Sequence, residues 1–281
     1  MFKRKLNIAV IVAMVFTLVL SGCAGTGTSD SENQGEAASQ TVADLSVYEN
    51  GDMFITPQEL NEKLGDPNVI IFDANKPDAY EKGHIPGAIG VGFHSFSKVD
   101  GKPGDPLWGT TLDKEELRAK LESYGVTNDK LVVFYSDVLP GPGPDGRNVW
   151  QMRMAGLDNV KLLYGGLPKW KELGYEVTKD ASPDPVPSEG LELSDFDQSY
   201  MATKEYINEN LENTVIIDVR TEDEFNGSQK AGEARGGHIT GAKHLVWSSL
   251  LNEDATPKSP EEITSIMAEL GVTPEDDFVV Y

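Results

Sequence analysis

The chain has 281 residues and a formal net charge of −22, because 46 Asp and Glu outnumber 24 Lys and Arg. This length holds two ordinary domains, and a hydrophobic content of 39% is enough for packed cores. Nucleic-acid binding requires cationic groups that neutralise phosphates, so the acidic balance predicts no nucleic-acid partner.

The N-terminal segment has the pattern of a bacterial lipoprotein signal. The basic residues KRK (3–5) precede LNIAVIVAMVFTLVL (6–20), which is short for a membrane span and typical of a signal-peptide core. LSGC (20–23) resembles a lipobox, which implies lipidation of Cys23 after removal of residues 1–22. We therefore expect a lipid-anchored, extracytoplasmic protein of the bacterial cell envelope. Two alternatives are a signal peptide with an incidental cysteine and an uncleaved anchor helix.

The next segment is rich in Gly, Ser, Thr and acidic residues and contains little that could be buried. Residues 24–44 read AGTGTSDSENQGEAASQTVAD, and we predict a flexible tether over residues 23–50. Cys23 is the only cysteine in the chain. Because the lipobox assigns it to the anchor, we expect neither a disulfide nor a free thiol in the folded part of this chain.

From residue 54 onward the chain repeats itself. VIIFDANKPDAYEKGHIPGAIGV (69–91) has its counterpart in residues 215–245, which begin VIIDVRTEDEF and include GGHITGAKHL. EELRAKLESYGVTNDKLVVFY (115–135) aligns without gaps on EEITSIMAELGVTPEDDFVVY (261–281). Two long blocks in the same order indicate a duplicated domain. The predicted division is a first domain over 51–180, a proline-rich linker over 181–194 and a second domain over 195–281.

Each copy has the pattern of an α/β domain. NVIIF (68–72) and TVIID (214–218) are short continuous apolar runs, which are typical of strands buried on both faces. Leu117 and Leu121 lie on one face of a predicted helix that Gly125 ends. Strands that alternate with helices predict a mainly parallel sheet flanked by helices in each domain, with the sheet of the second domain incomplete at the C-terminus. Further along the first copy, the pattern predicts a strand at 130–135, a helix at 147–156, a strand at 159–164 and a helix at 167–174.

Three motifs resemble the tandem-domain rhodaneses, the thiosulfate and 3-mercaptopyruvate sulfurtransferase family. They are GHIPGA (83–88), GHITGA (237–242) and AGLDNVKLLYGGLPKW (155–170), and the resemblance covers residues 54–281. It implies two rhodanese-like domains and a cysteine persulfide that carries the sulfur. The partners implied are a small anionic sulfur donor, such as thiosulfate or a mercaptoacid, and a thiol or cyanide acceptor.

In this family the strand that ends in VVY runs into the active-site loop, and the residue after it is the catalytic cysteine. Backbone N–H groups at a helix start stabilise a thiolate there. Ser136 holds this position in the first copy, and a hydroxyl cannot hold a transferable sulfur, so the first domain is predicted to be inactive. A serine nucleophile is disfavoured because no nucleophile elbow is present. In the second copy the position follows Tyr281, so we expect the sequence to be truncated and the intact gene to place Cys at position 282.

Three other positions belong to the predicted site of the second domain. Arg220 matches the family position that contacts the anionic donor, whereas the first copy has Asn75 there. The alternative is a surface arginine paired with the nearby Glu222 or Glu224. Asp218 and His238, like Asp73 and His84 in the first copy, are expected to hold the strand-end turn rather than to transfer protons.

The remaining candidates are weaker. His94 and His244 lack metal-ligand spacing, so we expect no metal and no cofactor. Arg235 either adds positive potential near the site or is a solvated loop charge. Two other functions stay open: a non-catalytic rhodanese-fold binding or sensor lipoprotein, and a phosphatase of related fold, which also needs a cysteine after Tyr281.

Overall fold

The computed structural model describes residues 43–105, 107–230 and 232–281. The predicted signal peptide, Cys23 and most of the predicted tether lie outside these residues. Contacts divide the chain into residues 1–39 and 40–281, and the description below concerns the second of these units. Within the described residues, no helix is both long enough and apolar enough to cross a membrane.

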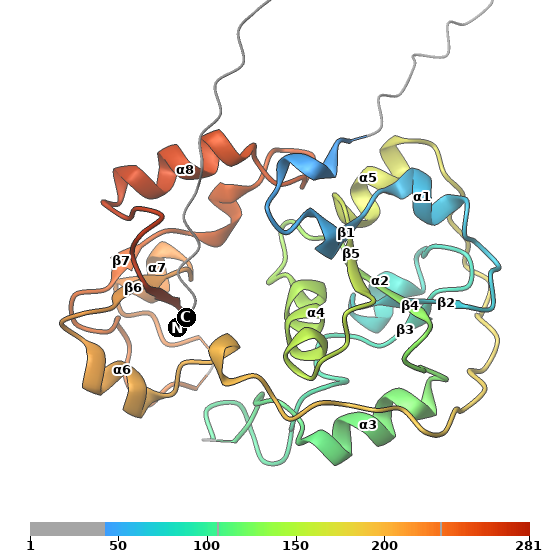
Figure 1. The fold of residues 1–281 in the computed structure, drawn as a ribbon, viewed down its shortest axis with the longest axis horizontal. Coiled ribbons are helices and arrows are strands. Elements are labelled where there is room, and N and C mark those ends of the chain that lie inside the picture. The colour runs from blue at the N-terminus through green and yellow to red at the C-terminus, as the bar shows by residue number, and fades with distance from the viewer. Residues whose placement is uncertain (1–42, 106, 231) are drawn as a thin grey trace, which may run out of the picture. The chain divides into compact units, whose positions relative to one another are not determined.

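The first sheet has five parallel strands in the order β1-β5-β4-β2-β3 (Figure 1). The central pair, β2 and β4, is in register along its whole length, and Asp73 lies opposite Tyr135 at its end. Two parallel strands that lie side by side can be joined only by a crossover connection, which is usually a helix. The strand order therefore confirms the predicted α/β fold. The strands are β1 (Phe54–Ile55), β2 (Val69–Asp73), β3 (Ile89–Gly90), β4 (Leu131–Tyr135) and β5 (Val160–Leu163).

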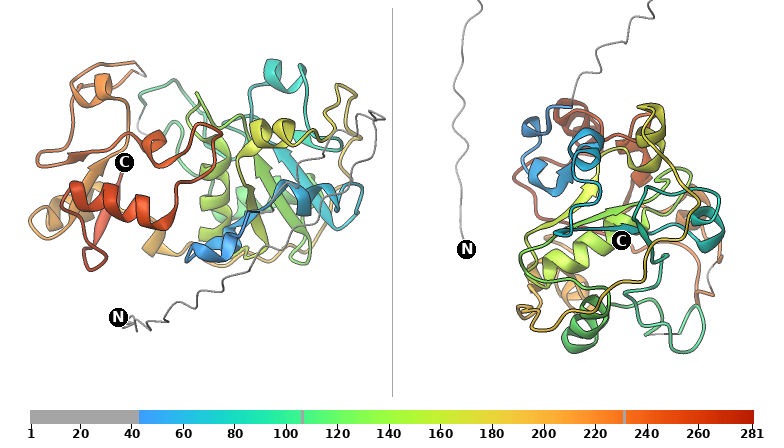
Figure 2. Two further views of the ribbon diagram at one scale, coloured as in Figure 1. Left: turned by 90° about the horizontal axis from the view of Figure 1, so that it is seen from above. Right: turned by 90° about the vertical axis from the view of Figure 1, so that its right-hand side faces the viewer.

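Helices cover both faces of this sheet (Figure 2). Phe72 and Phe134 pack into one core cluster with residues of α3 and α4, whereas Ile71 and Val133 pack into another with residues of α1 and α5. Burial on both faces explains why the strands read as continuous apolar runs. The helices are α1 (Pro57–Asn61), α2 (Pro77–Tyr80), α3 (Lys114–Ser123), α4 (Pro144–Met154) and α5 (Gly166–Glu172), and short 3-10 helices lie at Leu45–Val47 and Gly51–Met53.

The second sheet has three parallel strands in the order β7-β6-β8, which matches β3-β2-β4 of the first. Phe278 and Val280 of β8 are 51% and 54% exposed, whereas their counterparts Val132 and Phe134 are buried. One face of β8 is therefore uncovered within the described residues. The elements are α6 (Lys204–Asn210), β6 (Val215–Asp218), α7 (Glu222–Phe225), β7 (Lys243–His244), α8 (Pro260–Glu269) and β8 (Phe278–Val280), with 3-10 helices at Gln198–Tyr200 and Trp247–Leu250.

Local sequence signals start the long helices of both domains in the same way. Asp113 caps α3 in a capping box with Glu116, and Ser259 caps α8 in a capping box with Glu262. The segment after β4 is rich in Pro and Gly, a composition typical of a long loop, but only its first part is a loop. Pro144 begins α4, where a missing N–H costs nothing, so residues 144–147 are helical instead of part of the loop.

The segment predicted as a linker packs along the first domain. Residues 181–194 form no helix or strand, but Leu191 and Leu193 are buried in the first core cluster. The backbone N–H of Ser188 also donates to the carbonyl of Glu122 at the end of α3. The chain thus leaves the first domain along α3, and this path adds apolar area to its core.

Candidate functional site

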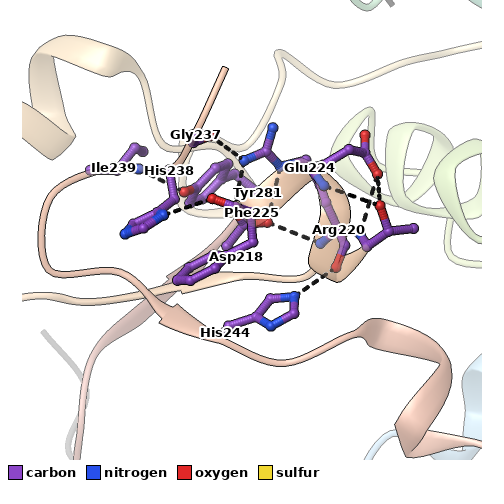
Figure 3. A network of polar contacts seen from close by, with 10 residues as sticks. Asp218, Arg220, Glu224, Phe225, Gly237, His238, Ile239, His244 and Tyr281 are labelled. Carbon is purple, nitrogen blue, oxygen red and sulfur yellow. Dashed lines mark hydrogen bonds and ion pairs between the residues drawn. The ribbon is translucent and has the colours of Figure 1, made fainter. Parts of the chain in front are cut away.

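The same polar contact closes the end of the central strand in both domains. The Tyr135 hydroxyl accepts a hydrogen bond from the backbone N–H of Ile85 at 3.0 Å. The Tyr281 hydroxyl accepts one from the N–H of Ile239 at 2.8 Å (Figure 3). Each contact joins the strand end to the turn that contains Gly-His-Ile. The end of the central strand is therefore held in the same way in the two domains, and Ser136 directly follows it in the first.

A stacked histidine supports this turn in each copy. The His84 ring stacks on Tyr80 with ring centroids 3.8 Å apart, and the His238 ring stacks on Phe225 at 3.7 Å. In both, the histidine Nδ1 lies 2.9 Å from the carbonyl oxygen of that aromatic residue, which can only accept a hydrogen bond. These contacts tie the turn to the preceding helix in both copies.

Arg220 is held by Asp218 at the end of β6 (Figure 3). Its Nε lies 3.0 Å from Asp218 Oδ1, its Nη2 lies 2.6 Å from Oδ2, and Nη2 also donates to the carbonyl of Gly237. The guanidinium lies over the Tyr281 ring, with its carbon 5.2 Å from the ring centroid. The partner is therefore Asp218 and neither of the nearby glutamates. Glu224 is engaged in the capping box of α7.

This ion pair sets the protonation of both groups. Burial alone would raise the pKa of Asp218, but the hydrogen bonds from Arg220 outweigh burial and bring that pKa below its ordinary value. The same hydrogen bonds raise the pKa of Arg220. The strand end of the second domain therefore carries an ionised carboxylate and a fixed, permanently charged fork of N–H donors.

The first domain repeats the backbone hydrogen bond at the strand end, but it has the uncharged Asn75 where the second domain has Arg220. The N–H of Asn75 donates to Asp73 Oδ1 at 2.8 Å, as the N–H of Arg220 does to Asp218 at 3.0 Å. The Asn75 side chain turns away and accepts from the N–H of Asp137 at 2.9 Å. Among the described residues, Asp73 Oδ2 has no hydrogen-bond partner, and burial raises the pKa of Asp73.

The start of α4, which follows the loop after β4, contains a buried acid that the sequence did not reveal. Ser136 is 1% exposed, and its hydroxyl accepts from the N–H of Val138 at 3.0 Å. Asp145, the second residue of α4, is 5% exposed, and its Oδ1 accepts from the N–H of Gly146 at 3.0 Å. An acid in the first turn of a helix is usually an exposed partner of the helix dipole, so no local signal distinguished Asp145.

The structure also describes the weaker candidates, His244, His94 and Arg235. His244 stacks on Phe225 at 4.5 Å, and its Nε2 lies 3.0 Å from the carbonyl oxygen of Arg220. His94 packs edge-on against Trp108 in the first domain, and Arg235 is an exposed loop residue. Over the described ranges, no group of three or more His, Cys, Asp and Glu side chains could hold a metal ion.

The chain is similar to known proteins in sequence and in fold. The profile of the Rhodanese-like domain family matches residues 56–173 and 203–281. The sulfur carrier protein TtuD of Thermus thermophilus is 29% identical over 249 residues, which are 83% of this chain and 83% of that protein. A predicted thiosulfate sulfurtransferase of Saccharopolyspora erythraea is 28% identical over 245 residues, 82% of this chain and 81% of that one.

Two solved structures show the likeness of fold. Wild-type EanB superposes with a TM-score of 0.68 at 24% identity, over 82% of this chain and 60% of EanB. YnjE superposes with a TM-score of 0.67 at 23% identity, over 82% of this chain and 58% of YnjE. The chain therefore spans about 60% of the length of EanB and slightly less of YnjE.

Because Asp73 and Asp218 have opposite pKa shifts, we predict opposite pH dependence for their asparagine variants. The ordinary pKa of both carboxyl groups is 3.8. The lowered pKa of Asp218 contributes stability above pH 3.8, and this contribution is lost as the pH falls through the folded-state pKa of Asp218. The raised pKa of Asp73 contributes stability below pH 3.8, and this contribution is lost as the pH rises through the folded-state pKa of Asp73.

Urea unfolding of Asp218→Asn and Asp73→Asn at acidic and neutral pH, beside the unchanged protein, measures both effects. Asp218→Asn should lower the free energy of unfolding by about 1.5–3 kcal/mol at neutral pH, as expected for hydrogen bonds to a charged group, and by less in acid. Asp73→Asn should cost most in acid and least at neutral pH. The same trend with pH in both variants would contradict the assignment.

Proposed function

The chain belongs to the rhodanese-like domain family, and from this premise we propose that it is a sulfurtransferase that works through a cysteine persulfide in its second domain. Sulfur transfer in general is supported by its relatives, whose names describe a sulfur carrier and thiosulfate sulfurtransferases. The proposed donor is a small sulfur-containing anion, thiosulfate or a mercaptoacid. The proposed acceptor is a thiol or cyanide.

The proposed nucleophile is a cysteine at the position that follows Tyr281. The observation that carries this assignment is the contact between Tyr281 and Ile239, which repeats that between Tyr135 and Ile85. It supports the proposal that the position after Tyr281 is equivalent to that of Ser136, where the family has its cysteine. Ser136 itself cannot hold a transferable sulfur, because a hydroxyl does not ionise usefully near neutral pH, so the first domain is proposed to be silent.

Arg220 is the proposed contact for the anionic donor. Asp218 occupies Nε and one edge of Nη2, and a guanidinium has five N–H donors in all, so Nη1 still offers donors to a ligand. Its orientation is fixed before the donor binds, which reduces the entropy lost on binding. In the first domain, Asn75 replaces this charge and directs its oxygen to a backbone N–H instead.

The proposed reaction has two displacements at sulfur. The cysteine thiolate attacks the outer sulfur of thiosulfate, a new S–S bond forms, and sulfite leaves with the electron pair of the broken S–S bond. The acceptor thiolate or cyanide then attacks the outer sulfur of the persulfide. The second S–S bond breaks, the acceptor leaves as a persulfide or as thiocyanate, and the enzyme thiolate is restored.

The experiment measures thiocyanate formation from thiosulfate and cyanide by the intact gene product. Replacement by serine of the cysteine expected after Tyr281 should abolish the activity. Arg220→Ala should lower kcat/KM by roughly 10- to 100-fold, the equivalent of one or two hydrogen bonds to a charged donor. Arg235→Ala, which removes the same charge from an exposed loop, should change kcat/KM little.

Two results would overturn the proposal. One is an equal rate for the intact product and its cysteine-to-serine variant, which would favour the alternative of a binding or sensor protein. The other is an intact gene with no cysteine codon after Tyr281. Turnover of a phosphate ester without any turnover of thiosulfate would instead favour the related phosphatases.

The proposed location is the outer side of a bacterial membrane, with the protein held there by a lipid on Cys23. This proposal rests on the sequence pattern LSGC after an apolar run, outside the described residues. Cells that express the full gene should incorporate labelled palmitate into the protein, and Cys23→Ser should remove the label and release the protein from the membrane fraction. Equal labelling of both forms would refute the assignment.

A further inference from the structure

We infer that the first domain has a binding site of its own, in the pocket beside Ser136, and that this site takes a small uncharged molecule with an amide-like polar group on an apolar body. The inference goes beyond the proposed function, because it concerns the domain proposed to be silent and requires no transfer of sulfur. Asn75 occupies the strand-end position that Arg220 has in the second domain, so this pocket has a hydrogen-bonding group without charge where the other copy has a cation.

The pocket beside Ser136 has the size and composition of a small-molecule site. Its volume is about 640 Å³, and such sites typically measure about 300–1,000 Å³. The walls come from the turn after β2, from a short segment after β3 and from the loop between β4 and α4. Much of this wall is apolar, and a few polar groups on an apolar wall are what fix the orientation of a ligand. Its larger apolar members are Phe93, Val138, Leu139, Pro140, Pro142 and Pro144.

Asn75 gives the pocket a hydrogen-bond donor. The backbone N–H of Asp137 can only donate, and it lies 2.9 Å from Asn75 Oδ1. This contact fixes the orientation of the amide, so that Nδ2 is the group left over. Among the described residues, Nδ2 is buried and has no hydrogen-bond partner. A ligand with an acceptor atom at this place therefore gains a hydrogen bond that the protein alone does not make.

His94 gives the pocket a second polar group. Its ring packs edge-on against Phe93 and Trp108, with ring centroids 4.4 and 4.7 Å away. Its Nδ1 is buried and, over the described ranges, makes no hydrogen bond. Burial lowers the pKa of His94 and the charge of Arg147 lowers it further, so the ring is neutral near neutral pH. A nitrogen of a neutral imidazole donates or accepts according to the tautomer, so it can meet either the carbonyl or the N–H of an amide.

The loop that forms one wall of the pocket is held in place by the protein itself. The N–H of Val138 donates to the Ser136 hydroxyl at 3.0 Å, and the N–H of Gly141 donates to the carbonyl of Val138 at 3.0 Å. The N–H of Leu167 in α5 donates to the carbonyl of Ser136 at 2.9 Å. Val138 has a φ of 57°, which is rare for a β-branched residue, and residues in such conformations concentrate at functional sites. A preformed wall reduces the entropy lost when a ligand binds.

The charges at the pocket favour an uncharged ligand. An anion would share the pocket with the carboxyl group of Asp137, whereas a cation whose polar atoms are all donors would leave Asn75 Nδ2 without an acceptor. Lys76 also lines the pocket, but it is exposed, so solvent screens its charge. Asp78 pairs with Lys82 at 3.5 Å. An amide offers both an acceptor and a donor, and it loses less hydration than an ion does when it enters an apolar pocket.

The test uses three probes of one shape and different charge: benzamide, which is uncharged, benzoate, an anion, and benzamidine, a cation at neutral pH. Each is titrated at neutral pH against the full chain with Cys23→Ser, which prevents the proposed lipidation, and ligand-observed NMR gives the Kd. Benzamide should bind with a Kd in the millimolar range. Benzoate and benzamidine should bind at least roughly 10-fold more weakly, because each brings a charge without a suitable partner.

Two variants locate the site. Asn75→Asp removes the Nδ2 donor, keeps the shape and can still accept from the N–H of Asp137. It should weaken benzamide binding by roughly 3- to 10-fold, the equivalent of one neutral hydrogen bond. His94→Phe keeps an aromatic ring beside Trp108 and removes Nδ1, and it should weaken binding to a similar extent. The matched control is Asn68→Asp, the same chemical change at an exposed residue of the same domain outside the pocket, and it should leave the Kd unchanged.

Three results would overturn the inference. They are a Kd for benzoate or benzamidine as low as that for benzamide, no binding of benzamide in the millimolar range, and an equal Kd for benzamide in Asn75→Asp and Asn68→Asp. If Asn75→Asp does not fold, the comparison of His94→Phe with Asn68→Asp decides the outcome. The readout is binding to the first domain and involves no turnover of thiosulfate. A protein that transfers no sulfur can therefore still support the inference, and an active sulfurtransferase can still contradict it.

Discussion

The rest of the structure depends on one hydrogen bond in each domain, from the backbone N–H of an isoleucine to the hydroxyl of a strand-end tyrosine. In the first domain both Tyr135 and Ile85 are fully buried, so the loss of this acceptor would leave a buried N–H without a partner, at a cost of about 1–3 kcal/mol. The bond locks the Gly-His-Ile turn to the end of the central strand. It thereby fixes the direction in which the chain leaves the strand, and the reacting group is proposed to lie at the next residue.

The two domains share this frame and differ in the charges placed around it. The second domain places a guanidinium, held by Asp218, above the ring of Tyr281. In the first domain Asn75 lies at that place and accepts from a backbone N–H, and the carboxyl of Asp145 is buried at the start of the following helix. A cation at the strand end favours a small anion. Duplication thus preserved the backbone geometry while the electrostatics of the copies diverged.

The fold could be predicted from the sequence because its signals are local or repeated. Continuous apolar runs identified the central strands, and Asp113 and Ser259 mark the starts of α3 and α8. The contacts of the candidate site were harder to predict, because they depend on how the chain turns after each strand. Spacing alone offered Glu222 and Glu224 as partners for Arg220, but the turn directs its side chain back to Asp218. Burial of Asp145 depends on the path of a loop with many Pro and Gly residues, which no periodicity encodes.

The most direct test of this account is amide hydrogen exchange at Ile85 in Tyr135→Phe. Removal of the hydroxyl should speed exchange of this amide by roughly 10- to 100-fold, the equivalent of about 1–3 kcal/mol of lost protection. Tyr124→Phe is the matched control, because the Tyr124 hydroxyl makes no hydrogen bond among the described residues while its ring packs against Phe72. It should leave the Ile85 amide unchanged. An Ile85 amide that exchanges at the same rate in Tyr135→Phe and in the unchanged protein would contradict the central claim.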